Sequence, residues 1–149
     1  MRIISEPTAA ALAYGLRFRS TDLKKCLVFD LGGGTFDVTV LTIQGDEIKV
    51  QAHAGDPHLG GQDIDNKIMD ECIEEFKRKY EKDLSNDQKA KARIKKASTD
   101  AKIELSNADE ADINIESLSP GCDLDMVITR EYFESLCEPI FERCMPPIR

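Results

Sequence analysis

The feature that most constrains the fold is the stretch from Cys26 to Val40, CLVFDLGGGTFDVTV. An apolar run ends at Asp30, three consecutive glycines follow, and every second residue from Phe36 onward is apolar. Two runs of this kind, separated by glycines, predict two β-strands joined as a hairpin. Phe36, Val38 and Val40 are expected on one face of the second strand.

The three glycines at the bend, with Asp30 before them and Asp37 after them, also suggest chemistry. Successive free amides in a glycine-rich turn form a concave nest that suits phosphate oxygens, and a strand-end carboxylate can hold a hydrated cation. A divalent cation would remove the repulsion between carboxylate and phosphate, so the pattern favours metal–nucleotide chemistry. An ordinary hairpin, with glycines for turn geometry alone, is the alternative. Neither GxxxxGK[ST] nor a GxGxxG run between strand and helix is present.

The charge, the apolar stretches and the cysteines of the chain exclude several classes of protein. The chain has 149 residues and a formal charge of −8, which argues against a nucleic-acid-binding surface. No apolar stretch is long enough to span a bilayer, and the first residues do not form a secretory signal, so we expect no membrane partner. Five cysteines without a CxxC pair indicate reduced thiols. These features predict a soluble cytoplasmic protein. They do not exclude that the full-length protein is located in an organelle.

The residues up to about Leu59 are predicted to form one helix and three strands. The helix begins at Glu6-Pro7 and ends at Gly15, and residues 17–25 form a polar loop. The strands are expected at Cys26–Leu31, Phe36–Ile43 and Glu47–Ala54, with Gln44-Gly45-Asp46 as a turn. The sequence AGDPHLGG is expected to be irregular, where the chain leaves the sheet.

Two long helices and two further strands are predicted next. The first helix begins at Asp63 or Asp65 and carries an apolar stripe to Tyr80; the second follows Asp87. The remaining elements are strands at 111–118 and 122–129, a short helix capped by Thr129, and a proline-containing tail, 137–149, that is expected to fray. The fold class is therefore α/β to α+β.

Four motifs in order resemble the seventy-kilodalton heat-shock chaperone family. They are IISEPTAAALAYGL, DLGGGTFDV, AGDPHLGGQDIDN and AKIELS. DLGGGTFDV is similar to the second phosphate-binding hairpin of the family's ATPase domain. The resemblance implies part of an actin-like, ribonuclease-H-like ATPase lobe, excised from a longer domain. Residues 1–59 would carry the hairpin, 60–137 would form a smaller α+β subdomain, and 138–149 would begin a return helix. Gly60-Gly61 is either a hinge or a simple turn into a helix.

The resemblance also assigns roles around the hairpin. Asp30 matches the aspartate that positions magnesium-bound water and the attacking water. Gly32, Gly33 and Gly34 match the amides that hold the terminal phosphates, and Thr35 matches a hydroxyl near the last phosphate. Asp37 matches a carboxylate associated with a monovalent cation such as K⁺. Glu6 matches a carboxylate that bonds to metal waters, although an acidic helix start explains it equally.

Lys102 and Ser106 match the family's contacts to ribose and adenine. They lie four residues apart, so one helix would place both on one face. Between them Ile103 replaces an arginine that many eukaryotic members stack on adenine, whereas bacterial and organellar members often share the KIELS pattern.

The function implied by the resemblance is that of a chaperone ATPase. In the parent, ATP or ADP with Mg²⁺ would control a peptide-binding domain through slow hydrolysis and cleft closure. The implied partners are J-domain cochaperones, nucleotide-exchange factors, and client peptides bound through a domain absent here. The alternative is a docking module for exchange factors with little nucleotide binding of its own. A sugar or acetate kinase of the same superfamily is disfavoured by EPTAAALAYG and AGDPHLGG.

Overall fold

The fold is described from a computed structural model covering residues 3–17, 21–45 and 47–148. Contacts divide the chain into two compact units. Unit 1 comprises Met1–Gly61 and Glu142–Arg149, and unit 2 comprises Gln62–Phe141. Each unit is described by itself.

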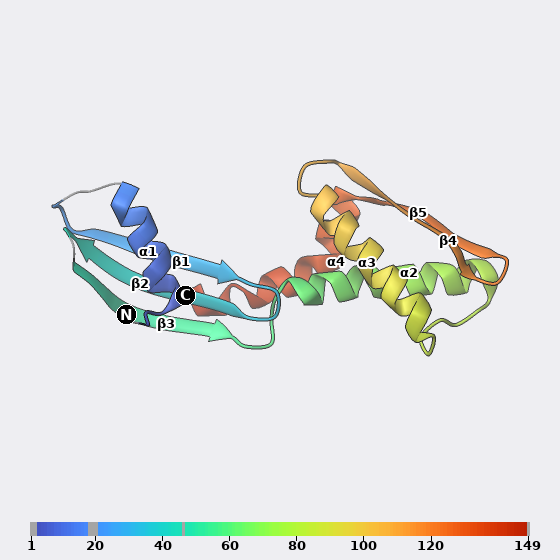
Figure 1. The fold of residues 1–149 in the computed structure, drawn as a ribbon, viewed down its shortest axis with the longest axis horizontal. Coiled ribbons are helices and arrows are strands. Elements are labelled where there is room, and N and C mark those ends of the chain that lie inside the picture. Colours follow the sequence, from blue (N-terminus) through green and yellow to red (C-terminus); the bar gives the residue numbers. More distant parts are fainter. Residues whose placement is uncertain (1–2, 18–20, 46, 149) are drawn as a thin grey trace. The chain divides into compact units, whose positions relative to one another are not determined.

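Unit 1 contains a three-stranded antiparallel sheet with a helix on one face (Figure 1). Helix α1 spans Glu6–Arg17, and the strands are β1 (Lys24–Leu31), β2 (Phe36–Gln44) and β3 (Glu47–Asp56), in the order β1-β2-β3. Beneath α1, Ala11 packs with Leu41 and Ile43 in a small core. A short 3₁₀ helix, η1 (Pro146–Ile148), belongs to the same unit.

The register of β1 and β2 confirms the hairpin predicted from the glycine-containing stretch. Asp30 lies opposite Asp37, and Leu31 lies opposite Phe36. Phe36 and Val38 on one face are buried, but Thr39 and Leu41 on the other face are buried as well, so β2 is covered on both faces. A bulge on β3 shifts the β2–β3 register between Val40 and Leu41.

Several predicted boundaries in unit 1 were wrong. Helix α1 continues past Gly15 to Arg17, and β1 begins at Lys24, so the predicted loop is shorter. Strand β3 continues through Gly55 and Asp56, which were expected to be irregular, because both residues pair with β2. The turn between β2 and β3 uses Gly45 at φ 58°, whereas Asp46 lies outside the described residues.

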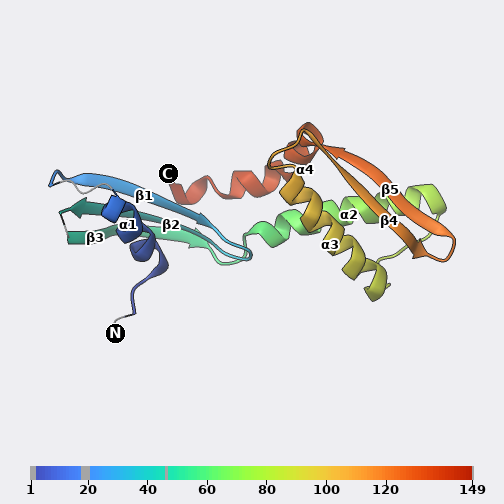
Figure 2. The same ribbon diagram turned by 45° about the horizontal axis from the view of Figure 1, so that its top comes forward.

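Unit 2 combines helices with a two-stranded antiparallel sheet. Helices α2 (Gly61–Tyr80) and α3 (Gln88–Glu104) precede strands β4 (Glu110–Ser119) and β5 (Cys122–Thr129), and helix α4 (Arg130–Arg143) follows. Helix α3 lies alongside β4 (Figures 1 and 2). The core contains apolar residues of all five elements, including Ile68, Phe76, Ile94, Ile113, Leu124, Ile128 and Ile140.

Capping residues begin two of these helices; the start of the second helix after Asp87 and the cap at Thr129 were predicted. The carboxylate of Asp87 accepts a hydrogen bond of 3.0 Å from the Ala90 amide at the start of α3. The Thr129 hydroxyl accepts one of 3.2 Å from the Tyr132 amide at the start of α4. Asp63 lies in the first turn of α2, which begins two residues earlier, at Gly61.

The prediction that the tail frays from residue 137 was wrong. Helix α4 runs to Arg143 with Pro139 in its interior. A proline there removes one backbone hydrogen bond. Cys137 and Ile140 on either side are buried, and this burial stabilises the helix across the proline.

The five cysteines are free thiols, and four of them are buried. Burial raises the pKa of the Cys72 thiol to about 12 and that of Cys137 to about 11. Both thiols therefore stay protonated near neutral pH and behave as small apolar core groups. Among the described helices, none combines the length and apolar character that crossing a membrane requires.

Candidate nucleotide site

The triple-glycine turn, Gly32–Gly34, joins β1 to β2 at one end of the unit 1 sheet. The Gly32 amide donates a hydrogen bond of 2.9 Å to the Thr35 carbonyl and closes the turn. Gly33, Gly34 and Thr35 are exposed. The positive φ values recorded for glycine are at Gly45 and Gly121 instead, in the two other hairpin turns. The glycines of this turn are therefore not explained by a left-handed backbone.

A second segment supports the turn from the following loop. The Gly61 amide donates a hydrogen bond of 2.8 Å to the Gly32 carbonyl. A Cβ atom on Gly60 would lie 2.6 Å from the Gly33 carbonyl carbon and oxygen and from the Gly34 nitrogen. Only glycine allows two backbones to approach this closely. Gly60 therefore packs against the triple-glycine turn and supports it. This role was not among the two considered from the sequence, a hinge and a simple turn into a helix.

The two amides at the tip of the turn are available to a ligand. Within the described part of the chain, no hydrogen bond uses the amide of Gly33 or Gly34. Both residues are exposed, so water or an anion can reach these donors. Adjacent free amides in a held turn have the chemistry of an anion-binding nest.

Asp37 belongs to a polar chain that crosses from β2 to β3. Its Oδ1 lies 3.4 Å from His53 Nε2, and His53 Nδ1 lies 3.0 Å from the Thr39 hydroxyl. Thr39 and His53 are opposite each other in the sheet. A Cβ on Gly55 would lie 2.3 Å from the Phe36 carbonyl oxygen and 3.0 Å from Asp37 Oδ1, so a side chain there would displace this carboxylate. The contact of His53 with Asp37 was not predicted from the sequence, because no pattern of neighbouring residues indicates a role for a single histidine in a strand.

A second polar cluster lies within unit 1, between the end of β3 and Arg143, the last residue of α4, which belongs to unit 1. Arg143 Nη2 donates to Asp56 Oδ2 at 2.6 Å and to the His58 carbonyl at 2.9 Å. The His58 amide donates to Asp56 Oδ1 at 2.9 Å. Arg143 was not predicted to have a role, because its partners are more than 80 residues away in sequence.

The Asp56 cluster predicts a specific dependence of stability on pH. The His58 amide, followed by Arg143, lowers the pKa of Asp56 below its ordinary value of 3.8. A carboxylate with a lowered folded pKa stabilises the fold at pH above 3.8, and that contribution is lost as pH falls through the folded pKa. Asp56→Asn should therefore reduce the acid sensitivity of unit 1, measured as the thermal midpoint from about pH 6 to about pH 3. Asp112→Asn, at an exposed position of β4, is the control, and equal pH profiles for wild type and Asp56→Asn would contradict the prediction.

Lys102 and Ser106 lie together in unit 2, beside a buried carboxylate. Lys102 Nζ is 2.6 Å from Asp65 Oδ1; the Lys102 side chain is 24% exposed and that of Asp65 is 8% exposed. Both Lys102 and Ser106 line a hollow of about 390 Å³. We call this the α3 hollow; its wall also includes Ile103, Arg130, Phe133 and Glu134. Ser106 lies one residue beyond the α3 C-cap, and its hydroxyl is 3.5 Å from the Lys102 carbonyl.

The ion pair between Asp65 and Lys102 was not predicted from the sequence, because Asp65 was considered only as a possible start of the helix. A signal was present. Asp65, Ile68 and Cys72 are three and then four residues apart, so Asp65 lies on the apolar stripe of α2. A charge at such a position requires a partner of opposite sign.

The predicted site residues therefore form two groups, one in each unit. The hairpin of unit 1 carries Asp30, Gly32–Gly34, Thr35 and Asp37, and the α3 hollow of unit 2 carries Lys102 and Ser106. Glu6 is exposed in the first turn of α1. Among the described residues, no hydrogen bond or ion pair connects Glu6 to the turn.

Comparison with known proteins identifies the class. The family model described as Hsp70 protein matches residues 1–149. The chain is 48% identical over 148 residues to heat shock 70 kDa protein 2 of Paracoccidioides lutzii, covering 99% of this chain and 23% of that protein. It is 49% identical over 152 residues to chaperone protein dnaK of Cyanidioschyzon merolae, covering 99% of this chain and 25% of that protein. A putative heat shock 70 kDa protein 7 of Homo sapiens is 47% identical over 146 residues, covering 98% of this chain and 40% of that protein.

The chain belongs to the Hsp70 family, and its mixed α/β fold is that of part of the ATPase domain. The family and fold class predicted from the four motifs are confirmed. The chain spans about a quarter of the length of most of the curated relatives it matches.

Proposed function

We propose that this chain supplies part of the nucleotide site of an Hsp70 chaperone ATPase. Each unit is proposed to contribute by itself: in unit 1 the triple-glycine turn contacts phosphates, and in unit 2 the α3 hollow contacts a nucleoside. The observation that carries the proposal is the pair of free, exposed amides at Gly33 and Gly34, in a turn held by Gly32, Gly60 and Gly61. A turn needed only to connect two strands would not require this second supporting segment.

Magnesium fits the residues near the turn. Asp30 lies at the end of β1, directly before the glycines, and no described residue forms an ion pair with it. A carboxylate of this kind suits Mg²⁺, which would neutralise charge on the phosphates when bound. Thr35 would place its hydroxyl near the last phosphate, and Glu6 would reach metal-bound water. K⁺ at Asp37 would have to share that carboxylate with His53.

The α3 hollow fits a nucleoside by its mixed lining. Ile103 is 60% exposed and offers an apolar surface to a base, whereas Lys102 and Ser106 offer polar groups. Asp65 holds the Lys102 ammonium in place. The aliphatic Ile103 can contact a base through dispersion but cannot supply the cation–π interaction of an arginine.

In the parent protein we propose slow hydrolysis of ATP coupled to cleft closure and client-peptide binding. J-domain cochaperones and exchange factors are the partners that follow from this proposal. The chain alone carries only part of the site, so we expect little or no hydrolysis from it. We place it in the cytoplasm, or in an organelle if the parent is organellar.

A second candidate function is a docking module for exchange factors, with little nucleotide binding. It is favoured by unit 2, Gln62–Phe141, which has its own core drawn from three helices and two strands. A subdomain with a separate core can present a surface whether or not nucleotide is bound.

Titration calorimetry tests the two candidates. For the nucleotide site we expect ADP and ATP to bind, more tightly with Mg²⁺ than without it. Asp30→Asn should abolish most of the magnesium dependence and weaken Mg-ATP binding about tenfold or more, since it removes a charged metal contact. Asp125→Asn, an exposed carboxylate on β5, is the matched control. Absent or millimolar affinity in a chain that unfolds cooperatively would instead favour the docking module.

A further inference from the structure

Unit 2 brings an amine and a thiol into contact. The ammonium of Lys82 donates a hydrogen bond of 3.3 Å to the sulfur of Cys122. Lys82 belongs to the segment that joins α2 to α3, and Cys122 is the first residue of β5, 40 positions further along the chain. The Cys122 thiol itself lies 3.7 Å from the Pro120 carbonyl, to which it can donate. A nucleophilic nitrogen and an oxidisable sulfur are therefore neighbours.

The segment that carries the lysine is anchored on both sides. Before it, the Tyr80 hydroxyl donates a hydrogen bond of 2.9 Å to the Asp123 carbonyl. After it, Leu84 is 4% exposed. Between them, Glu81 turns the chain at the end of α2 with a φ of 54°, a left-handed conformation that is uncommon for residues other than glycine. The fold therefore holds the backbone of Lys82 close to the start of β5.

Small oxidants can reach this pair. Lys82 is exposed, and Cys122 retains 7% exposure beside the turn at Gly121. Cys72 and Cys137, in contrast, are 0% exposed. Reactive cysteines in proteins lie beside cationic groups and within reach of solvent, whereas fully buried thiols are inert. Cys122 has both properties of a reactive thiol.

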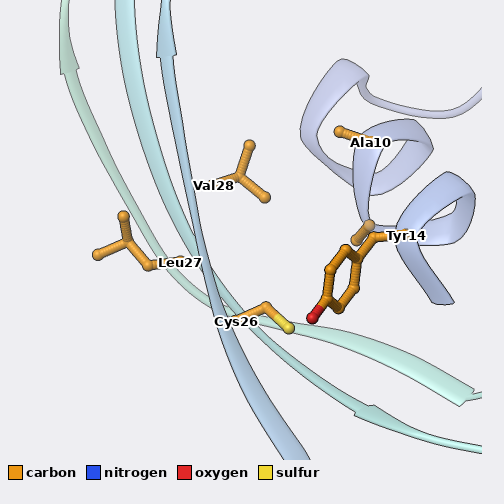
Figure 3. A pocket seen from close by; sticks show the side chains of 6 residues that line it. Ala10, Tyr14, Cys26, Leu27 and Val28 are labelled. Carbon is orange, nitrogen blue, oxygen red and sulfur yellow. The ribbon is translucent and has the colours of Figure 1, made fainter. Parts of the chain in front are cut away.

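Cys26 in unit 1 is a useful contrast. It is half-buried and lines a hollow of about 360 Å³ between α1 and β1 (Figure 3). The other residues that line this hollow are two alanines, Tyr14, Leu27 and Val28, and none of their side chains carries an amine. Oxidation of Cys26 therefore has no nitrogen among these side chains to capture it, and Cys26 serves as an internal control.

We propose that Lys82 and Cys122 form a redox modification site, at which a peroxide oxidises the thiol and the lysine captures the product as a sulfur–nitrogen cross-link. In the first step hydrogen peroxide transfers one oxygen atom to the sulfur. The thiol becomes a sulfenic acid, and the peroxide is reduced to water.

The second step needs no further oxidant. The Lys82 ammonium gives one proton to water, and the lone pair of the neutral amine attacks the sulfur. The bond from sulfur to oxygen breaks as the bond from sulfur to nitrogen forms, and the departing hydroxide takes a proton from the nitrogen and leaves as water. Sulfenic acids condense with backbone nitrogens by the same step.

The cross-link would close a loop that contains α3 and β4. A covalent bond between residues 40 positions apart restricts the unfolded chain, as a disulfide does. A thiol reductant reverses the cross-link by attacking the same sulfur. Oxidation would therefore stabilise unit 2 reversibly, and the effect does not require nucleotide.

Mass spectrometry of the 149-residue chain after treatment with hydrogen peroxide tests the proposal. In the wild type we expect two peptides joined through Lys82 and Cys122, lighter than the separate reduced peptides by two hydrogen atoms and separated again by dithiothreitol. The thermal midpoint should rise by about 5 °C or more on oxidation and return on reduction. Lys82→Arg keeps the charge but removes the amine, so both effects should be lost. Lys89→Arg makes the same change at an exposed position of α3 and should keep both.

Four results would overturn the proposal. The first is a wild-type Cys122 that stays a thiol, or becomes a sulfinic acid, without any joined peptide. The second is an equal yield of joined peptide in Lys82→Arg when circular dichroism shows that this variant is folded. The third is a joined peptide that retains the oxygen atom, because its sulfur would not be bonded directly to nitrogen. The fourth is a lysine cross-link at Cys26 as abundant as that at Cys122, because contact with an amine would then not direct the reaction.

Discussion

Replacing Gly60 with alanine is expected to lower the free energy of unfolding by about 1–3 kcal/mol, the usual cost of forcing a group into filled space. The added Cβ would lie 2.6 Å from three backbone atoms of Gly33 and Gly34. Backbone atoms cannot move aside as the end of a flexible side chain can. The triple-glycine turn would therefore have to shift, and the Gly61–Gly32 hydrogen bond would lengthen. Urea unfolding followed by circular dichroism measures the loss of stability.

Gly34→Ala is the matched control, because a Cβ at Gly34 has nothing within 4 Å. It should change the unfolding free energy by less than about 0.5 kcal/mol. Amide NMR shifts of Gly33 and Gly34 give a second measurement, and they should move in Gly60→Ala even where the chain remains folded. If Gly60→Ala were as stable as Gly34→Ala, with unchanged shifts at Gly33, the proposed support of the turn would be wrong.

Local patterns in the sequence were sufficient to predict most of the elements. The two strands around the glycines, the apolar stripe of α2, the helix start after Asp87 and the cap at Thr129 depend on neighbours within a few residues. The structure confirms them. The prediction that the tail frays was wrong because it considered only the local effect of Pro139. Its local effect is to break a helix, but burial of residues around it outweighs that effect.

Contacts between distant residues were not predictable in this way. The Gly60 contact with Gly33, the Arg143 contact with Asp56 and the His53 contact with Asp37 each depend on how strands and loops meet. The four motifs assigned roles to the turn by resemblance, but they did not reveal what holds the turn in place. That information lies in the spatial proximity of residues 16 to 87 positions apart along the chain.

Removal of the Lys102 side chain is expected to cost more stability than neutralisation of its partner Asp65. Lys102→Met leaves a carboxylate that is 8% exposed without its ion pair, and an uncompensated buried charge costs about 3 kcal/mol. Asp65→Asn leaves the lysine, whose side chain is 24% exposed and can turn toward water, so a loss of about 1 kcal/mol is expected. Urea unfolding of both single variants and of the double variant gives the coupling energy, which should be about 1–2 kcal/mol.

The pair of Glu75 and Arg78 on α2 is the control cycle, since the Arg78 side chain is 78% exposed and that of Glu75 is 24% exposed, so neither charge is fully buried. Its coupling should not exceed about 0.5 kcal/mol, as for other surface pairs one helical turn apart. Nucleotide titration of the same variants separates the two roles of Lys102. If Lys102 contacts the nucleoside and Asp65 only positions it, Lys102→Met should abolish binding in the α3 hollow, whereas Asp65→Asn should weaken binding by about tenfold or less. Equal stability losses for the two single variants would contradict the prediction. They would show that water reaches the Asp65 carboxylate once the Lys102 side chain is removed.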